Sequence, residues 1–446
     1  MPSLTLRKLK MKKLLKPLWA FLLLALSAPL ALAEEAEAVA SIDSGDTAWM
    51  LTATVLVLLM TIPGLSLFYG GLVKSKNILS VLMQCFFITA VMSILWVAFG
   101  YSFAANGDAA TGSKLFGDFK NMFLHKLTPD SVNANHPESV WITFQMTFII
   151  ITPALIVGAF AERMKFSAVL IFTTLWAILS YCPIWHMAWN TDIGLFAGWG
   201  AIDFAGGTVV HINAGIAGLV ACIMLGKRKG YPNTLSPPNS VPFTVIGAAL
   251  LWVGWFGFNA GSAGAANADA GFAMLTTQIA TAAAVIAWVA IESLTTGKPT
   301  AVGAATGAVA GLVAITPASG STTVVGALII GIASGIICFY GATKLKQAFG
   351  YDDSLDVFGV HGIGGIVGAI LTGIFIREGH DNYAMAGMEQ VVIQVKAVGV
   401  TIVWSAVASV IALSVAKYTV GLRVDEGDEE TGLDQSSHGE LSLIHI

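Results

Sequence analysis

The chain has 446 residues, of which 56% are hydrophobic and only 11% are charged, and its formal net charge is −4. This is too little charge to cover the surface of a soluble domain of that length, which excludes an ordinary soluble protein. The nearly balanced charge indicates no particular partner, and we expect none among nucleic acids. Runs of about 20 apolar residues, each long enough to cross roughly 30 Å of hydrocarbon, recur along the chain. The composition predicts an all-α polytopic membrane protein.

The N-terminal residues 1–33 have the form of a signal peptide. The stretch RKLKMKKLLKPLW is basic, FLLLALSAPL is a short apolar core, and ALA before Glu34 has the small-x-small form of a cleavage site. A first membrane span is the alternative, although the apolar core is short for one, and Met11 could be the true start. We therefore predict a membrane domain at 34–420 and a C-terminal tail at 421–446.

Eleven apolar ranges follow in chain order, joined by short links except at 104–138. Each has the length and hydropathy of a transmembrane helix. The predicted spans are 48–70, 78–103, 139–160, 166–187, 204–225, 243–261, 271–293, 300–317, 324–343, 357–376 and 391–419.

Lysine and arginine set the expected orientation. Only Lys114, Lys120, Lys126 and Arg377 fall on one side of the predicted membrane, and three of these lie in one long loop. The positive-inside rule therefore predicts the mature N-terminus outside and the tail in the cytosol, in agreement with an odd number of spans. The basic residues on the predicted cytosolic side are Lys74, Lys76, Arg163, Lys165, Lys227, Arg228, Lys229, Lys298, Lys344, Lys346 and Arg423.

The chain carries an internal repeat. HINAGIAG at 211–218 closes five spans at 48–225, and HGIGGIVG at 361–368 closes five spans at 243–376, so the two halves would have opposite topology. Matching features at the ends of two inverted halves are typical of transporter folds with a functional site near the bilayer midplane. The eleventh span stands outside this repeat.

His211 and His361 are the first candidates for that site. An ionisable side chain within a membrane is costly and usually faces an interior path, and imidazole exchanges a proton near neutral pH. Glycines at the fourth and seventh positions after each histidine would let another helix approach closely. Counted from the predicted helix starts, His211 lies about 12 Å deep from outside and His361 about 7–8 Å deep from the cytosol. We expect the two rings to approach each other from opposite faces and to share one proton.

Other interpretations of the pair remain open. Each histidine could satisfy a hydrogen bond in a packed interior. Metal ligation is disfavoured because no cysteine or carboxylate stands at ligand spacing and no HExxH occurs, so we expect no metal and no cofactor. The four cysteines, which we expect to be buried free thiols, are Cys85, Cys182, Cys222 and Cys338.

Asp203 and Asp356 precede the two histidine helices, and we expect both to be N-caps. No span contains a chain of carboxylates that could bind a metal cation or relay protons. The path between the two mouths should therefore be largely apolar, and the species that permeates it should be small and uncharged.

Long motifs resemble the ammonium transporters of the Amt/Mep/Rh superfamily, in their bacterial Amt branch. These motifs are FQMTFIIITPALIVGAFAERMKFSAVLIF, DFAGGTVVHINAGIAGLV, WFGFNAGSAGAANA, DVFGVHGIGGIVGAILTGIF and, in the tail, VGLRVDEGDEETGLDQSSHGE. The resemblance implies a homotrimer in the cell inner membrane with one pore and eleven spans per subunit. It also implies a PII-type signal protein docking on the cytosolic face, and a tail that couples subunits. By composition alone, the acidic tail would be a solvated, flexible end.

The resemblance also implies roles for single residues. His211 and His361 match the paired pore histidines, and Phe148 and Phe258 match two gating phenylalanines. Phe148, Trp189 and Ser262 match an external site that recruits ammonium. Aromatic faces attract cations, and the Ser262 hydroxyl accepts a hydrogen bond that ammonium donates and potassium cannot. Asp203 matches an acidic residue that supports this site without binding the ion.

The implied mechanism separates the nitrogen from its charge. An intact ion faces a Born cost of order tens of kcal/mol in an apolar channel, whereas desolvation lowers the pKa of an amine and favours its deprotonation. Ammonia, or methylamine from the analogue methylammonium, would then pass along the histidines. One alternative is a sensor, which typically carries an appended signalling domain that the short tail lacks. Another is a membrane metalloenzyme, for which ligands are too few. We expect a transporter and not an enzyme.

Overall fold

In a computed structural model of the chain, the described residues are 41–107, 112–233 and 237–441. The chain divides into two compact units, Met1–Ser41 and Ile42–Ile446, and everything below concerns the second. The predicted signal peptide lies outside the described residues.

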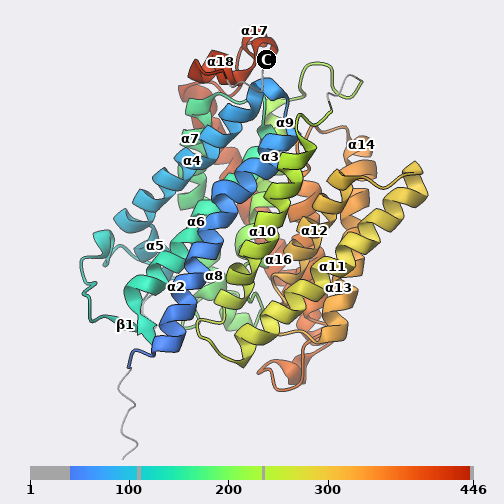
Figure 1. Ribbon diagram of the computed structural model, residues 1–446. Helices are drawn as coiled ribbons and strands as arrows, with labels where there is room; N and C mark the ends of the chain where they lie inside the picture. Colours follow the sequence, from blue (N-terminus) through green and yellow to red (C-terminus); the bar gives the residue numbers. More distant parts are fainter. Residues whose placement is uncertain (1–40, 108–111, 234–236, 442–446) are drawn as a thin grey trace, which may run out of the picture. The chain divides into compact units, whose positions relative to one another are not determined.

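The second unit is almost entirely helical (Figure 1). A helix falls on each of the eleven ranges predicted as spans. Within the described residues, nine helices are long and apolar enough to cross a membrane, and Ala301–Ile315 and Phe358–Thr372 are two shorter apolar helices. The nine long helices are Ser44–Leu72, Ser75–Ala105, Glu138–Phe160, Phe166–Trp189, Gly207–Leu225, Val241–Gly261, Ala268–Thr296, Val324–Phe349 and Met388–Thr419.

Several of these helices contain π-helical or 3₁₀ turns, labelled η, between α-helical segments. The elements of the N-terminal half are α2 (Ser44–Leu59), η1 (Met60–Leu65), α3 (Ser66–Leu72), η2 (Ser75–Asn77), α4 (Ile78–Leu95), η3 (Trp96–Gly100), α5 (Tyr101–Ala105), η4 (Met122–Leu124), the antiparallel strands β1 (Val132–Asn133) and β2 (His136–Pro137), α6 (Glu138–Phe160), α7 (Phe166–Trp176), η5 (Ala177–Tyr181), α8 (Cys182–Trp189), η6 (Ala197–Trp199), η7 (Gly207–Ile212) and α9 (Asn213–Leu225).

The C-terminal half follows the same pattern and ends in two short helices. Its elements are α10 (Val241–Gly261), α11 (Ala268–Thr296), α12 (Ala301–Ile315), α13 (Val324–Tyr340), η8 (Gly341–Leu345), α14 (Lys346–Phe349), η9 (Phe358–Gly362), α15 (Ile363–Thr372), η10 (Tyr383–Met385), α16 (Met388–Thr419), α17 (Glu426–Thr431) and α18 (Leu433–His438).

Polar side chains fix where four helices of the C-terminal half begin. The first backbone amides of a helix have no partner within it, and a side-chain oxygen placed just before the helix accepts from one of them. Four consecutive helices, α10 to α13, start in this way, with caps from Ser240, Asn267, Thr300 and Thr323. Short polar links thus end one apolar helix and start the next.

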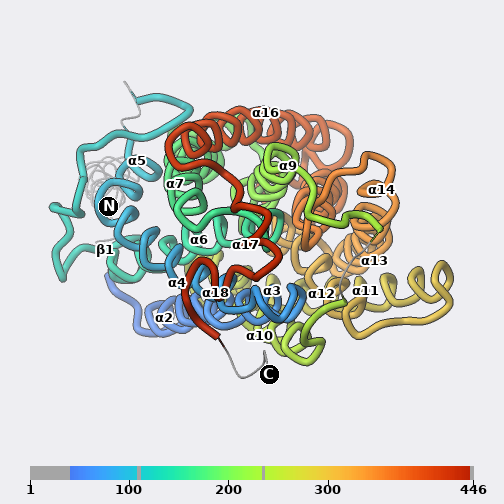
Figure 2. The backbone as a smooth tube through the Cα atoms, turned by 90° about the horizontal axis from the view of Figure 1, so that it is seen from above, coloured from blue at the N-terminus to red at the C-terminus, as the bar shows by residue number. Residues whose placement is uncertain are grey.

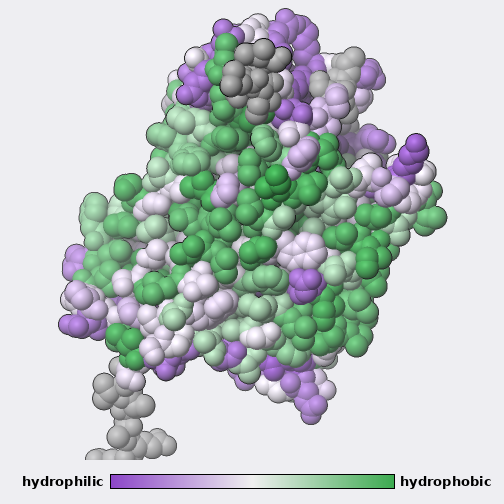
Figure 3. All heavy atoms as spheres, in the orientation of Figure 1, coloured by the Kyte–Doolittle hydropathy of each residue, from purple (hydrophilic) through white to green (hydrophobic). Residues whose placement is uncertain are grey.

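The outer surface is apolar between two polar ends. Large apolar side chains such as Ile286, Ile94 and Val403 are 64–73% exposed, and Figure 3 shows hydrophobic residues across the middle of the face in view with polar residues at both ends. A soluble protein does not expose an apolar surface of this extent, whereas a bilayer solvates it. The chain is a multi-pass membrane protein.

The acidic tail does not behave as its composition predicts. Helices α17 and α18 pack over the same end of the bundle that carries the start of α4, as the view in Figure 2 shows. Asp434 accepts from the Ser80 backbone amide at 2.7 Å, and the Leu433 amide donates to the Asn77 side chain at 2.8 Å. The tail up to residue 441 is therefore a docked element, held by specific polar contacts, and not a solvated end.

Candidate functional site

His211 and His361 lie together in the interior. Their Nδ1 atoms are 3.3 Å apart, and the two rings are stacked with centroids at 5.4 Å. Both side chains are buried, at 1% and 3% exposure. Because each neutral imidazole has one N–H and one lone pair, one Nδ1 donates to the other and the pair holds one proton between the rings. The expected proximity of the two histidines is observed.

The two histidine helices cross in direct contact at glycines. Segment η7 packs against α15, and η9 packs against α9, so each histidine segment contacts the helix that follows the other histidine. A Cβ atom at Gly215 would overlap the backbone of Gly362, and one at Gly365 would lie 2.8 Å from Ile212 Cγ1. The glycine at the fourth position after each histidine is therefore what brings the rings within hydrogen-bond distance.

The His211 helix starts later than the sequence predicts. It begins at Gly207, and residues 203–206 form a cap in which Gly206 has a left-handed φ of 118°. The Asp203 carboxylate accepts from the backbone amides of Gly206 at 2.9 Å and Thr208 at 2.8 Å, and also from the Thr208 hydroxyl. His211 is thus the fifth residue of its helix, one turn nearer the helix start than expected.

Aromatic rings continue from His211 toward the end of the bundle opposite the tail. Phe258 lies 5.9 Å from His211 between centroids, Phe148 lies 4.4 Å from Phe258, and Trp189 lies 5.7 Å from Phe148. Phe148 and Phe258 are fully buried. Trp189 is the last residue of the helix Phe166–Trp189, and the ring of Phe166, at the other end of this helix, contacts His438 of the tail. The ring series therefore reaches the end of the bundle that lies opposite the tail.

Ser262 and Asp203 are hydrogen-bonded to residues of the ring series. The Ser262 hydroxyl donates to the Phe258 carbonyl oxygen at 2.8 Å, which leaves the lone pairs of Oγ as acceptors. The Trp189 indole donates to the backbone oxygen of Asp203 at 2.8 Å. Asp203 therefore fixes both the start of the His211 helix and the orientation of Trp189, while its carboxylate is taken up by the cap.

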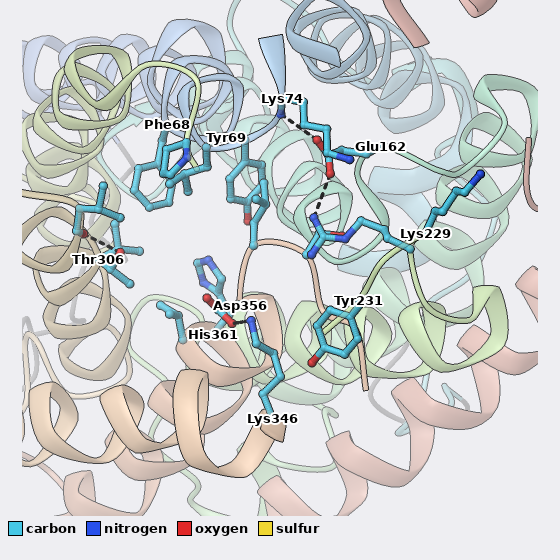
Figure 4. Close-up of a pocket in the computed structure, with 18 residues that line it drawn as sticks. Phe68, Tyr69, Lys74, Glu162, Lys229, Tyr231, Thr306, Lys346, Asp356 and His361 are labelled. Carbon is cyan, nitrogen blue, oxygen red and sulfur yellow. Dashed lines mark hydrogen bonds and ion pairs between the residues drawn. The ribbon is translucent and has the colours of Figure 1, made fainter. Parts of the chain in front are cut away.

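A cavity of about 210 Å³ reaches His361 from the tail end of the bundle. Its lining combines Phe68 and Tyr69 with charged groups, and the close-up in Figure 4 shows His361 beside the ion pair of Lys346 with Asp356. The charged residues of the lining are Lys74, Glu162, Arg228, Lys229, Lys346 and Asp356. One side of the histidine pair is therefore in contact with a polar mouth and the other with a stack of aromatic rings.

A buried ion-pair network forms one wall of this mouth. Arg228 contacts Asp352 at 2.8 Å and Glu162 at 2.9 Å, and both carboxylates are almost completely buried. Burial acts to raise the pKa of Asp352, but the hydrogen bonds and positive charge of Arg228 outweigh it, and the pKa lies below its usual value. This network was not predicted from the sequence, because its partners are separated by up to 124 residues.

The N-cap prediction for Asp356 is wrong. Asp356 has a left-handed φ of 60° and pairs with Lys346, while Asp353 accepts from the Phe358 amide at 2.8 Å at the start of the His361 helix. Burial, followed by the charge of Asp356, raises the pKa of Asp353 to about 6. The DxxD spacing places two acids where either could cap, and the Lys346 contact decides between them.

Trp255 is a part of the site that sequence reasoning missed. Its ring stacks on His211 with centroids at 5.3 Å, and its indole donates to Thr316 at 2.9 Å. Trp255 stands three residues before Phe258, on the same helix face, which is the signal that could have identified it. The His211 Nε2 atom has no hydrogen-bond partner among the described residues.

The described residues contain no group of three histidine, cysteine, aspartate or glutamate side chains that could hold a metal ion. The four cysteines are all free and buried, as predicted. Two adjacent imidazoles without a third ligand do not make a zinc site, which needs at least three protein ligands.

Residues 48–442 match the family model described as the Ammonium Transporter Family. The chain belongs to the ammonium transporter family. The resemblance found in the sequence motifs is therefore confirmed, and the chain is a multi-pass member of this family.

Individual ammonium transporters are similar to this chain over nearly their whole length. The ammonium transporter of Aquifex aeolicus is 48% identical over 408 residues, covering 90% of this chain and 94% of the relative. That of Bacillus subtilis is 45% identical over 406 residues, covering 89% and 98%. Among solved structures, Saccharomyces cerevisiae Mep2 has a TM-score of 0.78 at 32% identity, covering 87% and 92%. A structure titled Sensor Amt Protein has a TM-score of 0.82 at 29% identity, covering 89% and 98%.

Proposed function

We propose that this ammonium transporter recruits ammonium at an aromatic site, removes its proton and conducts neutral ammonia past His211 and His361. The observation that carries the proposal is the histidine pair, with Nδ1 atoms 3.3 Å apart between a ring stack and a polar cavity. The pair offers a small neutral base a donor or an acceptor on each ring. The unpartnered Nε2 of His211 favours a solute that supplies the missing hydrogen bond.

Recruitment would take place at the contact of Trp189 with Phe148, with Ser262 one helical turn after Phe258. The faces of tryptophan and phenylalanine attract a cation by about 0.5–2 kcal/mol, depending on desolvation. Because the Ser262 hydrogen is already donated to the Phe258 carbonyl, the Ser262 oxygen is free to accept from an N–H. Potassium has no hydrogen to donate, so this arrangement favours ammonium.

The two buried phenylalanines, Phe148 and Phe258, support the loss of charge before conduction. Their rings lie 4.4 Å apart and close the space between Trp189 and His211 to a hydrated ion. An intact monovalent ion in such surroundings faces a Born cost of order tens of kcal/mol, which deprotonation avoids. The proton would cross separately, over the histidine pair, so that the net species transported is ammonium. A current across a reconstituted bilayer on adding ammonium would distinguish this net ammonium transport from net ammonia conduction, which carries no charge.

The proposed topology has eleven crossings, with the N-terminus outside and the tail in the cytosol. It is supported by equivalent packing in the two halves: α6 packs on α9 in the first, and α12 packs on α15 in the second. The reciprocal contacts of η7 with α15 and η9 with α9 favour an inverted repeat of five helices each. The eleventh helix, α16, packs on α7 and α9 outside this repeat.

The assembly follows from the family. We infer a homotrimer in the cell inner membrane, and the exposed apolar faces of α11 and α13 are compatible with contacts between copies or with lipid. A PII-type signal protein would dock at the cytosolic face, where the charged mouth and the docked tail stand together.

Uptake of ammonium or methylammonium in a transport-deficient cell tests the proposal. The double variant His211→Leu/His361→Leu should abolish or strongly change uptake, because the path would lose its polar groups. The matched control His125→Gln/His380→Gln replaces two loop histidines and should transport like the wild type. Equal uptake by both double variants would refute a role for the pair. Bound metal in the wild type that disappears in the double variant would point to a metalloenzyme instead.

A further inference from the structure

His186 makes two contacts that a neutral ring cannot make. The side chain is completely buried in α8. Its Nδ1 atom lies 2.8 Å from the backbone oxygen of Ala104, and its Nε2 atom lies 2.9 Å from the backbone oxygen of Ser113. Both ring nitrogens therefore face a hydrogen-bond acceptor.

A carbonyl oxygen accepts hydrogen bonds and donates none. A neutral imidazole has one N–H and one lone pair, so one of the two contacts would set a lone pair against a carbonyl oxygen, whereas an imidazolium donates to both. Turning the ring over does not help, because it would put ring carbons at 2.8–2.9 Å from the oxygens. Carbon–oxygen contacts of the C–H···O type are longer, at about 3.3–3.6 Å.

His186 lies where two helices end. The residue lies in the last turn of α8, and Ala104 lies in the last turn of α5. His186 thus lies at the carbonyl end of its own helix, Phe166–Trp189, and its ring contacts the carbonyl end of a second helix, Ser75–Ala105. Cations are stabilised at such ends. The hydrogen-bond partners found for His186 in the described part of the chain are both backbone carbonyls.

We propose that His186 is held as an imidazolium that clamps α8 to α5 and to the loop at Ser113, and thereby positions Trp189. Trp189 follows His186 by three residues on the same helix, and its ring meets Phe148 and Trp185 at 5.7 Å each. The Asn190 amide adds a parallel link to the Ala105 carbonyl oxygen at 3.1 Å. His186 would thus act on the recruitment site through Trp189, and this part of the inference rests on the proposed function.

The protonation state can be read directly by nitrogen NMR on the full-length wild-type protein in lipid at pH 7.5. Trp185–His186 is the only Trp-His pair in the sequence, so carbonyl-¹³C tryptophan with ¹⁵N-histidine marks this one residue. We expect both ring nitrogens of His186 to be protonated. One protonated and one bare nitrogen would overturn the proposal, and this readout does not depend on what the protein transports.

Transport kinetics test the positioning role. His186→Gln offers a single amide nitrogen, which cannot donate to both carbonyls across the ring's span. We expect KM for methylammonium to rise about 10-fold with kcat within about twofold, because a misplaced positioning group costs up to about 100-fold. The control His125→Gln, in an exposed loop, should match the wild type. A loss of kcat at unchanged KM would overturn the positioning role. Absence of uptake by the wild type would overturn the proposed function and leave the NMR result standing.

Discussion

Gly365→Ala tests whether the glycine contact sets the spacing of the histidine pair. A Cβ atom at this position would lie 2.8 Å from Ile212 Cγ1, 3.1 Å from the Ile212 amide nitrogen and 3.2 Å from His211 Cβ. Ordinary contacts are about 3.5–4.0 Å, so the two atoms held by the backbone require the helices to separate by about 0.3–0.4 Å. A change of rotamer does not relieve this, since two of the three atoms are fixed by the backbone.

The separation acts directly on the site. Adding about 0.4 Å to the Nδ1–Nδ1 distance of 3.3 Å gives about 3.7 Å, which no longer holds a hydrogen bond. Overpacking of this kind typically costs about 1–3 kcal/mol, which leaves the protein folded. A displacement of about 1 Å can cost up to about 100-fold in rate, so we expect this smaller displacement to lower uptake by roughly 10-fold.

Initial rates of labelled methylammonium uptake into proteoliposomes, at equal amounts of protein, measure the effect. Gly399→Ala in α16 is the matched control, because a Cβ atom there would meet nothing within 4 Å. Alanine is favoured over glycine in a helix, so the control should be as stable as the wild type and transport equally well. If Gly365→Ala and Gly399→Ala transport at the same rate, the spacing argument is refuted.

Three further outcomes follow from the described contacts. Ser262→Ala removes the hydroxyl oxygen that would accept a hydrogen bond from the ammonium ion, and a hydrogen bond to a charged group contributes about 1.5–3 kcal/mol. The KM for methylammonium should therefore rise roughly 10-fold to 100-fold. An unchanged KM would exclude Ser262 from recruitment. Arg228→Met removes the cationic partner of the buried carboxylates Asp352 and Glu162 and should cost about 3–5 kcal/mol, seen as a lower Tm at pH 7.5. Because the pKa of Asp352 is lowered in the folded state, the wild-type advantage should shrink as the pH falls through that pKa; a constant difference would contradict the assigned ion pair. Asp353→Asn should raise Tm at pH 7.5, and should raise it less at pH 5. A carboxyl whose pKa in the folded protein is about 6 destabilises the protein increasingly as the pH rises from about 4 to 6, and by a constant amount above that. A lower Tm of the variant at both pH values would show that the helix cap needs the negative charge.

The helices and the meeting of His211 and His361 could be predicted from the sequence, because both depend on local patterns. Apolar length defines a membrane helix, and the repeated spacing of histidine and glycine marks a close crossing. Trp189, Phe148 and Ser262 came only from the resemblance, since aromatic and hydroxyl side chains occur throughout apolar helices. The contact of Trp189 with Phe148 joins residues 41 positions apart in the chain, which periodicity does not describe.

The features that could not be predicted depend on contacts between distant parts of the chain. Arg228 is paired with acids 66 and 124 residues away, and the tail is fixed by backbone amides near residue 80. Composition identified the tail as acidic and polar but could not identify the basic and amide groups that bind it. Asp353 and Asp356 are equivalent candidates by spacing, and only the position of Lys346 distinguishes them.

The backbone contact of Gly215 with Gly362 limits how this protein could be re-engineered. Where two helices touch through main chain alone, no side chain can be trimmed to make more room between them. Libraries that vary only the rings and aliphatic groups around the histidines would therefore alter selectivity without widening the distance between the helices. Admission of bulkier amines would require a redesigned crossing, with insertions or a changed helix register in both halves at once.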